Sequence, residues 1–443
     1  MTADSQNTRL VCKKAFAAIK SDGSVITWGD PDSGGDSSLV EDQLQDGVVQ
    51  VVGNYFAFAA VKSDGSVITW GVIGSGGDHS FVEDRFQEGV VQVVGSTAAF
   101  AAVKSDGSVI TWGHTGSGGN SSRVEDGLQE GVVQVSGSAE AFTAVKSDDS
   151  VITWGGSGSG GDSSRVEDRL QEAVVLVVCT HLAFTAVKPD GSAITWGDSE
   201  FGGDSSDVED RLQEGVVQVV GNNSAFAAVK SDGSVIAWGD SHEGGGSTLV
   251  EDQLQEGVVQ VMANTRVFAA IKSDGSVVTW GDSGDGGDSS HVQDQLQEGV
   301  VQVVGNTQAF AAVKSDGSVI TWGNSGSGGA SSRVEDRLQD GVVQVFCNTE
   351  AFAAVKSDGS VITWGDSGSG GDSSCVEDRL QEGVVQVIGN RVAFAAIKSD
   401  GSVITWGVPS EGGETFHVQD QLQEGVVQVV GNVYAFAAVK SHS

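Results

Sequence analysis

The sequence is poor in basic side chains. Its 443 residues contain 24 Lys and Arg against 60 Asp and Glu, which gives a formal net charge of −36 at pH 7. Phosphate backbones are bound by clustered Lys and Arg, and anionic membranes repel a strongly acidic surface. The charge therefore argues against direct binding of nucleic acid or membrane, and we expect a protein partner that is basic or of mixed charge.

Proline and long apolar runs are also scarce. The chain has 3 prolines, while hydrophobic residues make up 39% of it, a combination that argues against disorder. No stretch approaches the roughly 18 apolar residues of a membrane span, and residues 1–14 lack the apolar core of a signal peptide. We therefore expect a soluble intracellular protein, cytoplasmic or nuclear.

What the sequence has instead is a strict internal repeat. Its 10 tryptophans stand 42 residues apart without insertion or deletion, from Trp28 to Trp406. A fixed period of about 20–50 residues is typical of solenoids, propellers and arrays. The period predicts a single ten-repeat body over residues 15–440, with residues 1–14 as an N-terminal cap or partial strand and 441–443 as a tail.

Each unit contains three β-rich runs. In one copy these are residues 384–388, 393–398 and 402–406, and an Asp-Gly pair between the last two predicts a hairpin turn. Both faces of these runs are mostly apolar, which predicts sheets covered on both sides. Phe394 and Trp406 are expected to fill the space between layers.

A Gly/Ser/Asp loop follows each Trp-Gly, and a further short segment follows the loop. In that segment Ser374 and Glu377 fit a capping box, while Val376 and Leu380 are four residues apart. The pattern favours one or two helical turns ended by Gly383. The alternative is a fourth, irregular strand at the sheet edge.

The series Val-Val-Gln-Val, Phe-Ala-Ala-Val-Lys-x-Asp-Gly-Ser-Val-x-Thr-Trp-Gly and Gly-Gly-Asp-Ser-Ser resembles the regulator of chromosome condensation repeat. Asp400-Gly401, Trp406-Gly407 and most of their counterparts carry the resemblance, which covers roughly residues 6–440. It implies a mainly β chain of ten tandem 42-residue repeats in a β-propeller-like assembly. The units are shorter than the usual family repeat, lack its typical His, and outnumber its seven blades. An open β-solenoid or superhelix with short helical turns is therefore the alternative.

The resemblance implies several functions, because members of that family act as nucleotide-exchange factors for a small GTPase, as substrate-binding parts of ubiquitin ligases, as light sensors and as scaffolds. A fold does not select among such functions. The acidic chain lacks the basic contacts that the exchange and chromatin roles normally use. Regulation of a small GTPase by nucleotide exchange is thus an alternative that rests on the resemblance alone.

The sequence contains no recognisable grouping of catalytic residues. Of the 7 histidines only His291 and His417 share a repeat position, and no grouping with Ser and Asp or with Cys can be argued. The 4 cysteines form no Cys-x-x-Cys pair and are expected to fill small sites. We expect no enzymatic activity.

The loop aspartates are the candidate metal ligands. Carboxylate, carbonyl and hydroxyl oxygens suit Ca²⁺, although turn-forming, solvated aspartates would produce the same pattern. The candidate pairs are Asp30 and Asp36, Asp198 and Asp204, Asp282 and Asp288, and Asp366 and Asp372. A calcium-binding structural or adhesive repeat protein is accordingly one alternative function, with Ca²⁺ as the only cofactor considered.

Positions at which the copies differ are candidate partner-binding sites. They follow Trp-Gly, precede the expected helical turn, or lie in the linker between the first two strands. Unconstrained surface loops drift there too, but repeat scaffolds also present different side chains at such positions. The leading hypothesis is a non-enzymatic scaffold that binds protein through variable loops. Its candidate contact residues are Tyr55, Phe56, Phe81, Arg123, Arg165, Phe201, His291, Arg333 and His417.

Overall fold

The computed structural model describes residues 15–19, 23–29, 33–78, 80, 82–171, 173–414, 422–424, 426–431 and 436–440. The chain divides into two compact units, Met1–Ser224 and Ala225–Ser443, and each is described by itself. The expected cap over residues 1–14, the tail, and the candidate residues Asp30, Phe81 and His417 lie outside the described residues.

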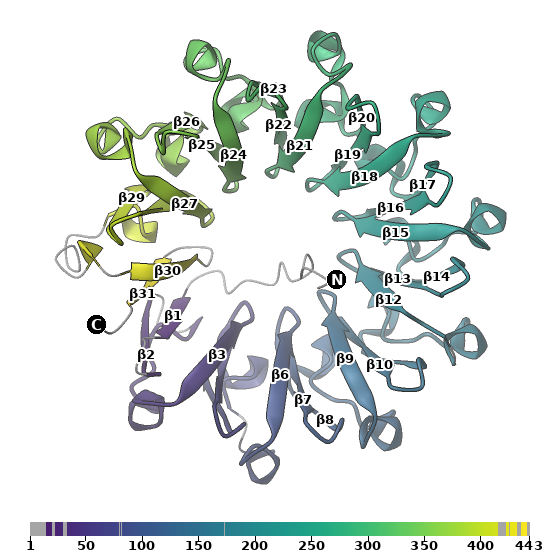
Figure 1. Cartoon of the computed structure of the whole chain (residues 1–443). Helices are drawn as coiled ribbons and strands as arrows, with labels where there is room; N and C mark the ends of the chain where they lie inside the picture. Colours follow the sequence, from purple (N-terminus) through teal and green to yellow (C-terminus); the bar gives the residue numbers. More distant parts are fainter. Residues whose placement is uncertain are drawn as a thin grey trace. The chain divides into compact units, whose positions relative to one another are not determined.

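Three-stranded antiparallel sheets repeat along the chain, nine in the described part, with a two-stranded sheet near each end (Figure 1). In each three-stranded sheet the strand order follows the chain. The strands of the first unit are β1 (Ala15–Ile19), β2 (Val25–Gly29), β3 (Val48–Gly53), β4 (Ala57–Lys62), β5 (Val67–Gly71), β6 (Val90–Gly95), β7 (Ala99–Lys104), β8 (Val109–Gly113), β9 (Val132–Gly137), β10 (Ala141–Lys146), β11 (Val151–Gly155), β12 (Leu176–Cys179), β13 (Ala183–Val187), β14 (Ala193–Gly197) and β15 (Val216–Gly221).

The second unit repeats the same succession. Its strands are β16 (Ala225–Lys230), β17 (Val235–Gly239), β18 (Val258–Ala263), β19 (Val267–Lys272), β20 (Val277–Gly281), β21 (Val300–Gly305), β22 (Ala309–Lys314), β23 (Val319–Gly323), β24 (Val342–Cys347), β25 (Ala351–Lys356), β26 (Val361–Gly365), β27 (Val384–Gly389), β28 (Ala393–Lys398), β29 (Val403–Gly407), β30 (Val426–Gly431) and β31 (Phe436–Lys440). The predicted fold class, a mainly β chain of tandem repeats, is confirmed by the repeated three-stranded antiparallel sheets.

The second and third strands of each sheet form the predicted hairpin. Gly65 supplies the left-handed backbone of one such turn at φ +80°, and its amide donates to the Lys62 carbonyl at 2.8 Å. Asp149 occupies the same place in another copy, with φ +63°. The register of β4 and β5 sets Phe58 opposite Trp70, with the two rings stacked 5.2 Å apart.

The hairpin aspartate also stabilises its turn. The hydroxyl of Ser108 donates to Asp106 at 2.7 Å and its amide donates at 2.9 Å, and these bonds hold the pKa of Asp106 below its usual value of 3.8. Eight other described copies show the same lowering by the serine two residues on: Asp64, Asp148, Asp190, Asp232, Asp274, Asp316, Asp358 and Asp400. The repeated Asp-Gly-Ser is therefore a capped turn.

This turn gives a testable pH dependence. A depressed folded pKa contributes stability that is present above the unfolded value of 3.8 and is lost as pH falls through the folded pKa. We expect S108A to raise the pKa of Asp106, measured by NMR titration. The variant's deficit in thermal stability at pH 6 should disappear below the folded pKa, and a deficit that is unchanged at low pH would contradict this account.

The first strand of a three-stranded sheet is an edge strand, and in most described copies, though not in β12, its pairing contains a bulge. Between β3 and β4 the register shifts between Val48 and Gln50, so Val49 has no partner residue and is 62% exposed. Bulges at sheet edges oppose pairing with a further strand. This bulge could not be predicted, because apolar residues on both faces of the strand hide any break in alternation.

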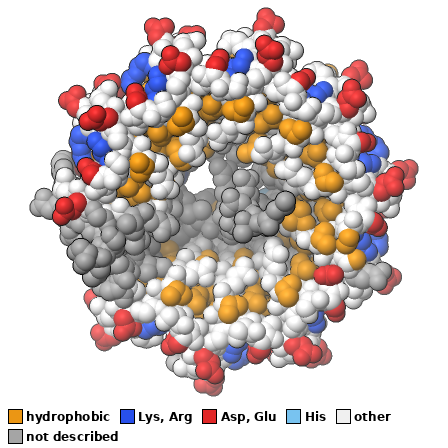
Figure 2. Space-filling model, viewed as in Figure 1, with side chains coloured by type: hydrophobic (Ala, Val, Ile, Leu, Met, Phe, Trp, Pro, Cys, Tyr) orange, Lys and Arg blue, Asp and Glu red, His pale blue; other side chains and the backbone are white. Residues whose placement is uncertain are grey.

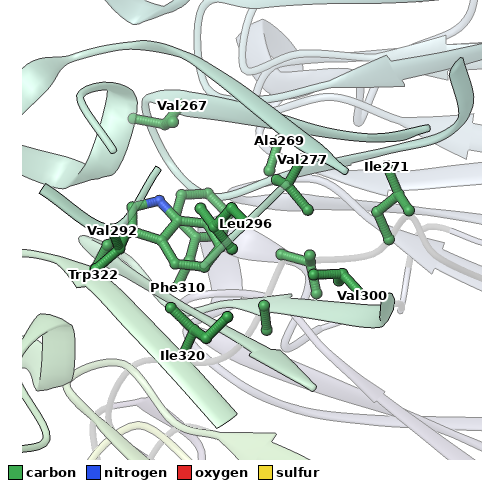
Figure 3. Packing of buried hydrophobic residues seen from close by; sticks show 12 residues of the cluster. Val267, Ala269, Ile271, Val277, Val292, Leu296, Val300, Phe310, Ile320 and Trp322 are labelled. Carbon is green, nitrogen blue, oxygen red and sulfur yellow. The ribbon is translucent and has the colours of Figure 1, made fainter. Parts of the chain in front are cut away.

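Successive sheets pack as the predicted layers. In the second unit, Val267 and Ala269 of β19 face Phe310 and Trp322 of the next sheet, and all four are fully buried (Figure 3). The indole N–H of Trp322 also donates to the carbonyl of Gly286, in the loop of the preceding repeat, at 3.1 Å. Each interface thus joins apolar burial to one buried hydrogen bond.

Two short helical turns interrupt each repeat. Those after Trp-Gly are η3 (Ile73–Ser75), η5 (Thr115–Ser117), η7 (Ser157–Ser159), η9 (Ser199–Phe201), η11 (Ser241–Glu243), η13 (Ser283–Gly287), η15 (Ser325–Gly329), η17 (Ser367–Gly371) and η19 (Pro409–Glu411). Those before the next sheet are η2 (Glu41–Leu44), η4 (Glu83–Arg85), η6 (Glu125–Leu128), η8 (Glu167–Leu170), η10 (Glu209–Leu212), η12 (Glu251–Leu254), η14 (Ser290–Val292), η16 (Glu335–Arg337) and η18 (Glu377–Leu380). Among the described residues no helix is long and apolar enough to cross a bilayer.

The expected helical turn before each sheet is confirmed, whereas the expected capping box is wrong. The N-cap of η18 is Val376, which makes no side-chain capping bond. Ser374 lies two residues before that N-cap, and its amide donates to Asp372 at 2.9 Å. The Asp-x-Ser turn therefore competes successfully with a Ser-x-x-Glu cap at this place.

Candidate functional site

The variable residues gather on two kinds of surface within each unit. We call the first the tip surface. It comprises the helical turns before each sheet and the residues around them: 37–46, 82–88, 121–130, 163–171, 205–214, 247–256, 289–298, 331–340 and 373–382. We call the second the linker row. It comprises residues 54–56, 96–98, 138–140, 180–182 and 222–224 in the first unit, and 264–266, 306–308, 348–350 and 390–392 in the second.

Each tip is anchored by one buried apolar side chain, which is a leucine except in the copy with Phe86. Leu170 of η8 is fully buried and packs in a cluster with Trp196 and Phe184 of the following sheet. The guanidinium of Arg169 then reaches the carbonyl of Ala193 at 3.4 Å, which ties the tip to that sheet. The tip is thus held rigidly on one side while its other side faces solvent.

One variable position is exposed in every described tip. Leu39 and Leu249 are both 97% exposed. The same repeat position holds a basic, acidic, imidazole or thiol side chain in the other described copies, and all are exposed: Arg123, Arg165, Asp207, His291, Arg333 and Cys375. The structure therefore presents a different side chain at the same point of each successive tip.

The surroundings of that position are acidic. Exposed carboxylates occupy each tip, as at Glu125, Asp126 and Glu130, and Figure 2 shows Asp and Glu gathered over these turns. Arg169 pairs with Glu209 of the next tip at 3.2 Å, so successive tips of the first unit are neighbours. Such exposed pairs contribute about 0–1 kcal/mol and leave the surface strongly negative.

The basic candidates lie close to loop carboxylates. The pKa of Asp162 is lowered, and the main cause is the hydrogen bond from the Ser164 amide. The positive charges of Arg165 and Arg123 lower it further. Arg333 similarly adds to the Ser374 bonds that lower the pKa of Asp372. The structure thus brings Arg123 and Arg165 together across successive repeats.

The linkers are organised by a residue whose role the sequence did not reveal. Asn306 is fully buried, and its side-chain oxygen accepts the amides of Gln308 at 3.0 Å and Ala309 at 2.8 Å. Its side-chain nitrogen donates to the Ser327 carbonyl at 2.6 Å, which fixes the linker against the Trp-Gly loop. The signal was a recurrent Asn after the first strand, replaced by Ser or Thr in Ser96, Ser138 and Thr180.

Successive linkers are joined by backbone hydrogen bonds into a continuous row. In the first unit the amides of Tyr55, Thr97 and Ala139 donate to the linker carbonyl of the following repeat at 3.2, 2.8 and 3.0 Å. His181 continues the series by donating to Asn223 at 3.0 Å. Neighbouring linkers are therefore spaced like adjacent strands, about 5 Å apart.

The described aromatic candidates lie in this row or in the loop beside it. Phe56 is 39% exposed and its ring lies 6.3 Å from that of Tyr55, which is partly buried. Phe201 is partly buried, with its ring 6.1 Å from the imidazole of His181. The row thus carries two aromatic pairs within the first unit.

In the second unit one arginine gathers three carboxylates. Arg266 contacts Asp282 at 3.0 Å, Glu243 at 3.2 Å and Asp285 at 3.4 Å. Burial raises the pKa of Asp285, and the neighbouring Asp282 charge adds to the effect. Asp282, one of the expected calcium ligands, is here an ion-pair partner.

The remaining loop aspartates act as turn caps. Asp198 accepts the amide of Glu200 at 2.9 Å, and Asp366 accepts that of Ser369 at 2.7 Å. The second members of the pairs each accept the amide two residues on, which lowers their pKa: Asp36, Asp204, Asp288 and Asp372. No group of three or more His, Cys, Asp or Glu placed to hold a metal ion occurs in the described part of the chain.

The described cysteines at the shared repeat position fill small sites. The thiols of Cys179 and Cys347 lie 3.5 and 3.4 Å from the carbonyls of Gly137 and Gly305 in the preceding repeat. Burial raises the pKa of Cys179 to about 11, so its thiol stays protonated at neutral pH.

The chain is similar in structure to human WBSCR16, with a TM-score of 0.35 and 20% identity over 62% of this chain and 91% of the other. Prp20p from Saccharomyces cerevisiae gives a TM-score of 0.33 and 14% identity, covering 62% of this chain and 82% of its own. The ectodomain of the Arabidopsis thaliana receptor kinase ACR4 gives 0.30 and 15%, covering 60% and 93%. No family model and no curated protein matches the sequence.

Proposed function

We propose that the protein is a non-enzymatic scaffold whose tip surface and linker row bind a protein partner of basic or mixed charge. The observation that carries this proposal is the variable tip position. It is exposed in all described copies, on a rigid and repeated support, while its chemistry changes from leucine to arginine, aspartate, histidine and cysteine. Repeat scaffolds use such positions for recognition.

The expected charge of the partner follows from the acidic residues around the variable tip positions. Each tip adds several exposed carboxylates, and the whole chain carries −36. Complementary charge speeds association and suppresses wrong partners more than it adds affinity. Selectivity would then come from the variable side chains, and the exposed carboxylates shared by all tips would attract basic surfaces.

A pair of matched variants tests the proposal. The tip variant replaces five exposed variable residues with serine: Leu39, Arg123, Arg165, Leu249 and Arg333. The control variant replaces five exposed hairpin serines, at a repeat position that varies only at Pro189, with alanine: Ser63, Ser105, Ser147, Ser273 and Ser315. Both variants should melt at the temperature of the wild type, because none of these side chains is buried.

We expect affinity capture from extracts of the source cells to recover basic or mixed-charge proteins with the wild type and with the control variant. The tip variant should lose most of that material, and raised salt should release it. Retention of the same proteins by both variants would show that the tips do not recognise partners.

A further inference from the structure

The Trp-Gly loop of the second repeat forms an apolar patch with its linker. Ile73 is 71% exposed, and Phe56 and Val72 are 39% and 37% exposed. The Val72 amide donates to the Phe56 carbonyl at 3.0 Å, and the Asn54 side chain donates to the Ser75 carbonyl at 2.7 Å. The loop and the linker are therefore tied together, and the patch is a fixed surface.

The charge along the same row is of one sign. The linkers of the first unit and its Trp-Gly loops after residue 71 contain no Lys or Arg. Glu140 occupies the linker position of Phe56 two repeats later and is exposed, and Glu200 is exposed in the loop of the repeat after that. The row thus runs from an apolar end to an acidic end.

The hydrogen-bonded linkers set the distance between these ends. Two linker steps separate Phe56 from Glu140, and three steps lead to the repeat that carries Glu200. At about 5 Å per step these spans are roughly 10 and 15 Å. An extended peptide advances about 3.3 Å per residue, so the spans correspond to about three and about five residues.

We propose that the linker row of the first unit binds an extended segment of the partner protein that has a large apolar side chain and, three to five residues away, Lys or Arg. The apolar side chain lies on Phe56, Val72 and Ile73, and the cations lie beside Glu140 and Glu200. This inference rests on the proposed scaffold function and names the segment that its linker row selects.

Synthetic peptides test the spacing. The probes are fluorescein-labelled Gly-Leu-Gly-Gly-Lys-Gly-Lys-Gly, its reversed sequence, and a control of the same composition with leucine and both lysines adjacent. One of the two spaced probes should bind at least about tenfold more tightly than the adjacent control in fluorescence polarisation. Equal affinity of all three would show that composition alone is sensed, and the inference would be wrong.

Protein variants locate the site. I73T, which copies Thr115 of the next repeat, combined with F56A should weaken the better probe about tenfold. E140Q with E200Q should weaken it and remove its salt dependence. Val49→Thr, which changes an exposed apolar side chain of the same unit at the β3 bulge, outside the linker row and the tip surface, should leave the affinity unchanged.

The outcome is separable from that of the scaffold proposal. If no probe binds, or if V49T weakens binding as much as the linker variants do, the linker-row inference is overturned. The scaffold proposal then still stands if the tip variant loses its partners, and it falls only if that variant retains them.

Discussion

Replacing Gly160 with alanine is expected to destabilise the first unit by about 3 kcal/mol. Gly160 has φ +91°, a conformation that costs an L-residue about 1–2 kcal/mol. A Cβ built there would lie 2.5 Å from Cδ2 of Phe184, and overpacking of a core typically costs about 1–3 kcal/mol. The Gly160 carbonyl also accepts the indole N–H of Trp196 at 3.0 Å, so the loop cannot move away without losing that bond.

Gly158, two residues earlier in the same loop, is the matched control. A Cβ at Gly158 meets no atom within 4 Å, and its backbone is not left-handed. G158A is therefore expected to change the free energy of unfolding by less than about 1 kcal/mol. Urea denaturation of both variants measures the difference, and equal midpoints would show that the loop does not hold the next repeat.

Amide hydrogen exchange can show which strands are destabilised in G160A. Stability in a repeat protein is approximately the sum of terms for each repeat and for each interface between neighbours. The loss of protection in G160A should therefore centre on β13 and β14, which carry Phe184 and Trp196. Protection lost uniformly across the first unit would contradict a nearest-neighbour interface.

The repeat core was predictable because its signals are local and repeated ten times. The Asp-Gly pair specifies the hairpin at Gly401, and apolar residues on both strand faces specify layers. The rings of Phe394 and Trp406 then lie opposite each other because the hairpin sets their register. These features need no knowledge of distant contacts.

The loops were less predictable because one residue pattern serves several structures. An aspartate followed by glycines and serines occurs in calcium-binding loops, in ordinary turns and in capping boxes. At Asp372 and Ser374 the short-range Asp-x-Ser turn forms, and the N-cap of η18 is Val376, two residues after the serine. The Asp-x-Ser spacing was the signal that favours the turn.

The sequence indicated where the variable residues lie in each repeat, but not which of them share one surface. Variation among the copies marked the exposed tip position and the linkers correctly. It did not show that Phe56 and Glu140 share one hydrogen-bonded row, because that row depends on backbone contacts between residues 42 apart. Buried Asn306 was also missed, since a conformational role in a linker leaves only a recurrent Asn as its trace.

Replacing Trp322 with alanine is expected to have the largest effect of any single change in the second unit, about 4 kcal/mol. Trp322 is fully buried and stacks on Phe310 at 5.3 Å (Figure 3), and truncating a buried aromatic side chain typically costs about 3–5 kcal/mol. W322F keeps a buried aromatic ring but removes the donor to the Gly286 carbonyl and part of the buried ring volume. That variant should lose less than W322A, about 2 kcal/mol, because the carbonyl loses its partner and the ring becomes smaller. Denaturant melts of both variants measure the two losses. Equal losses would mean that the indole hydrogen bond, and not burial of the ring, holds successive repeats together.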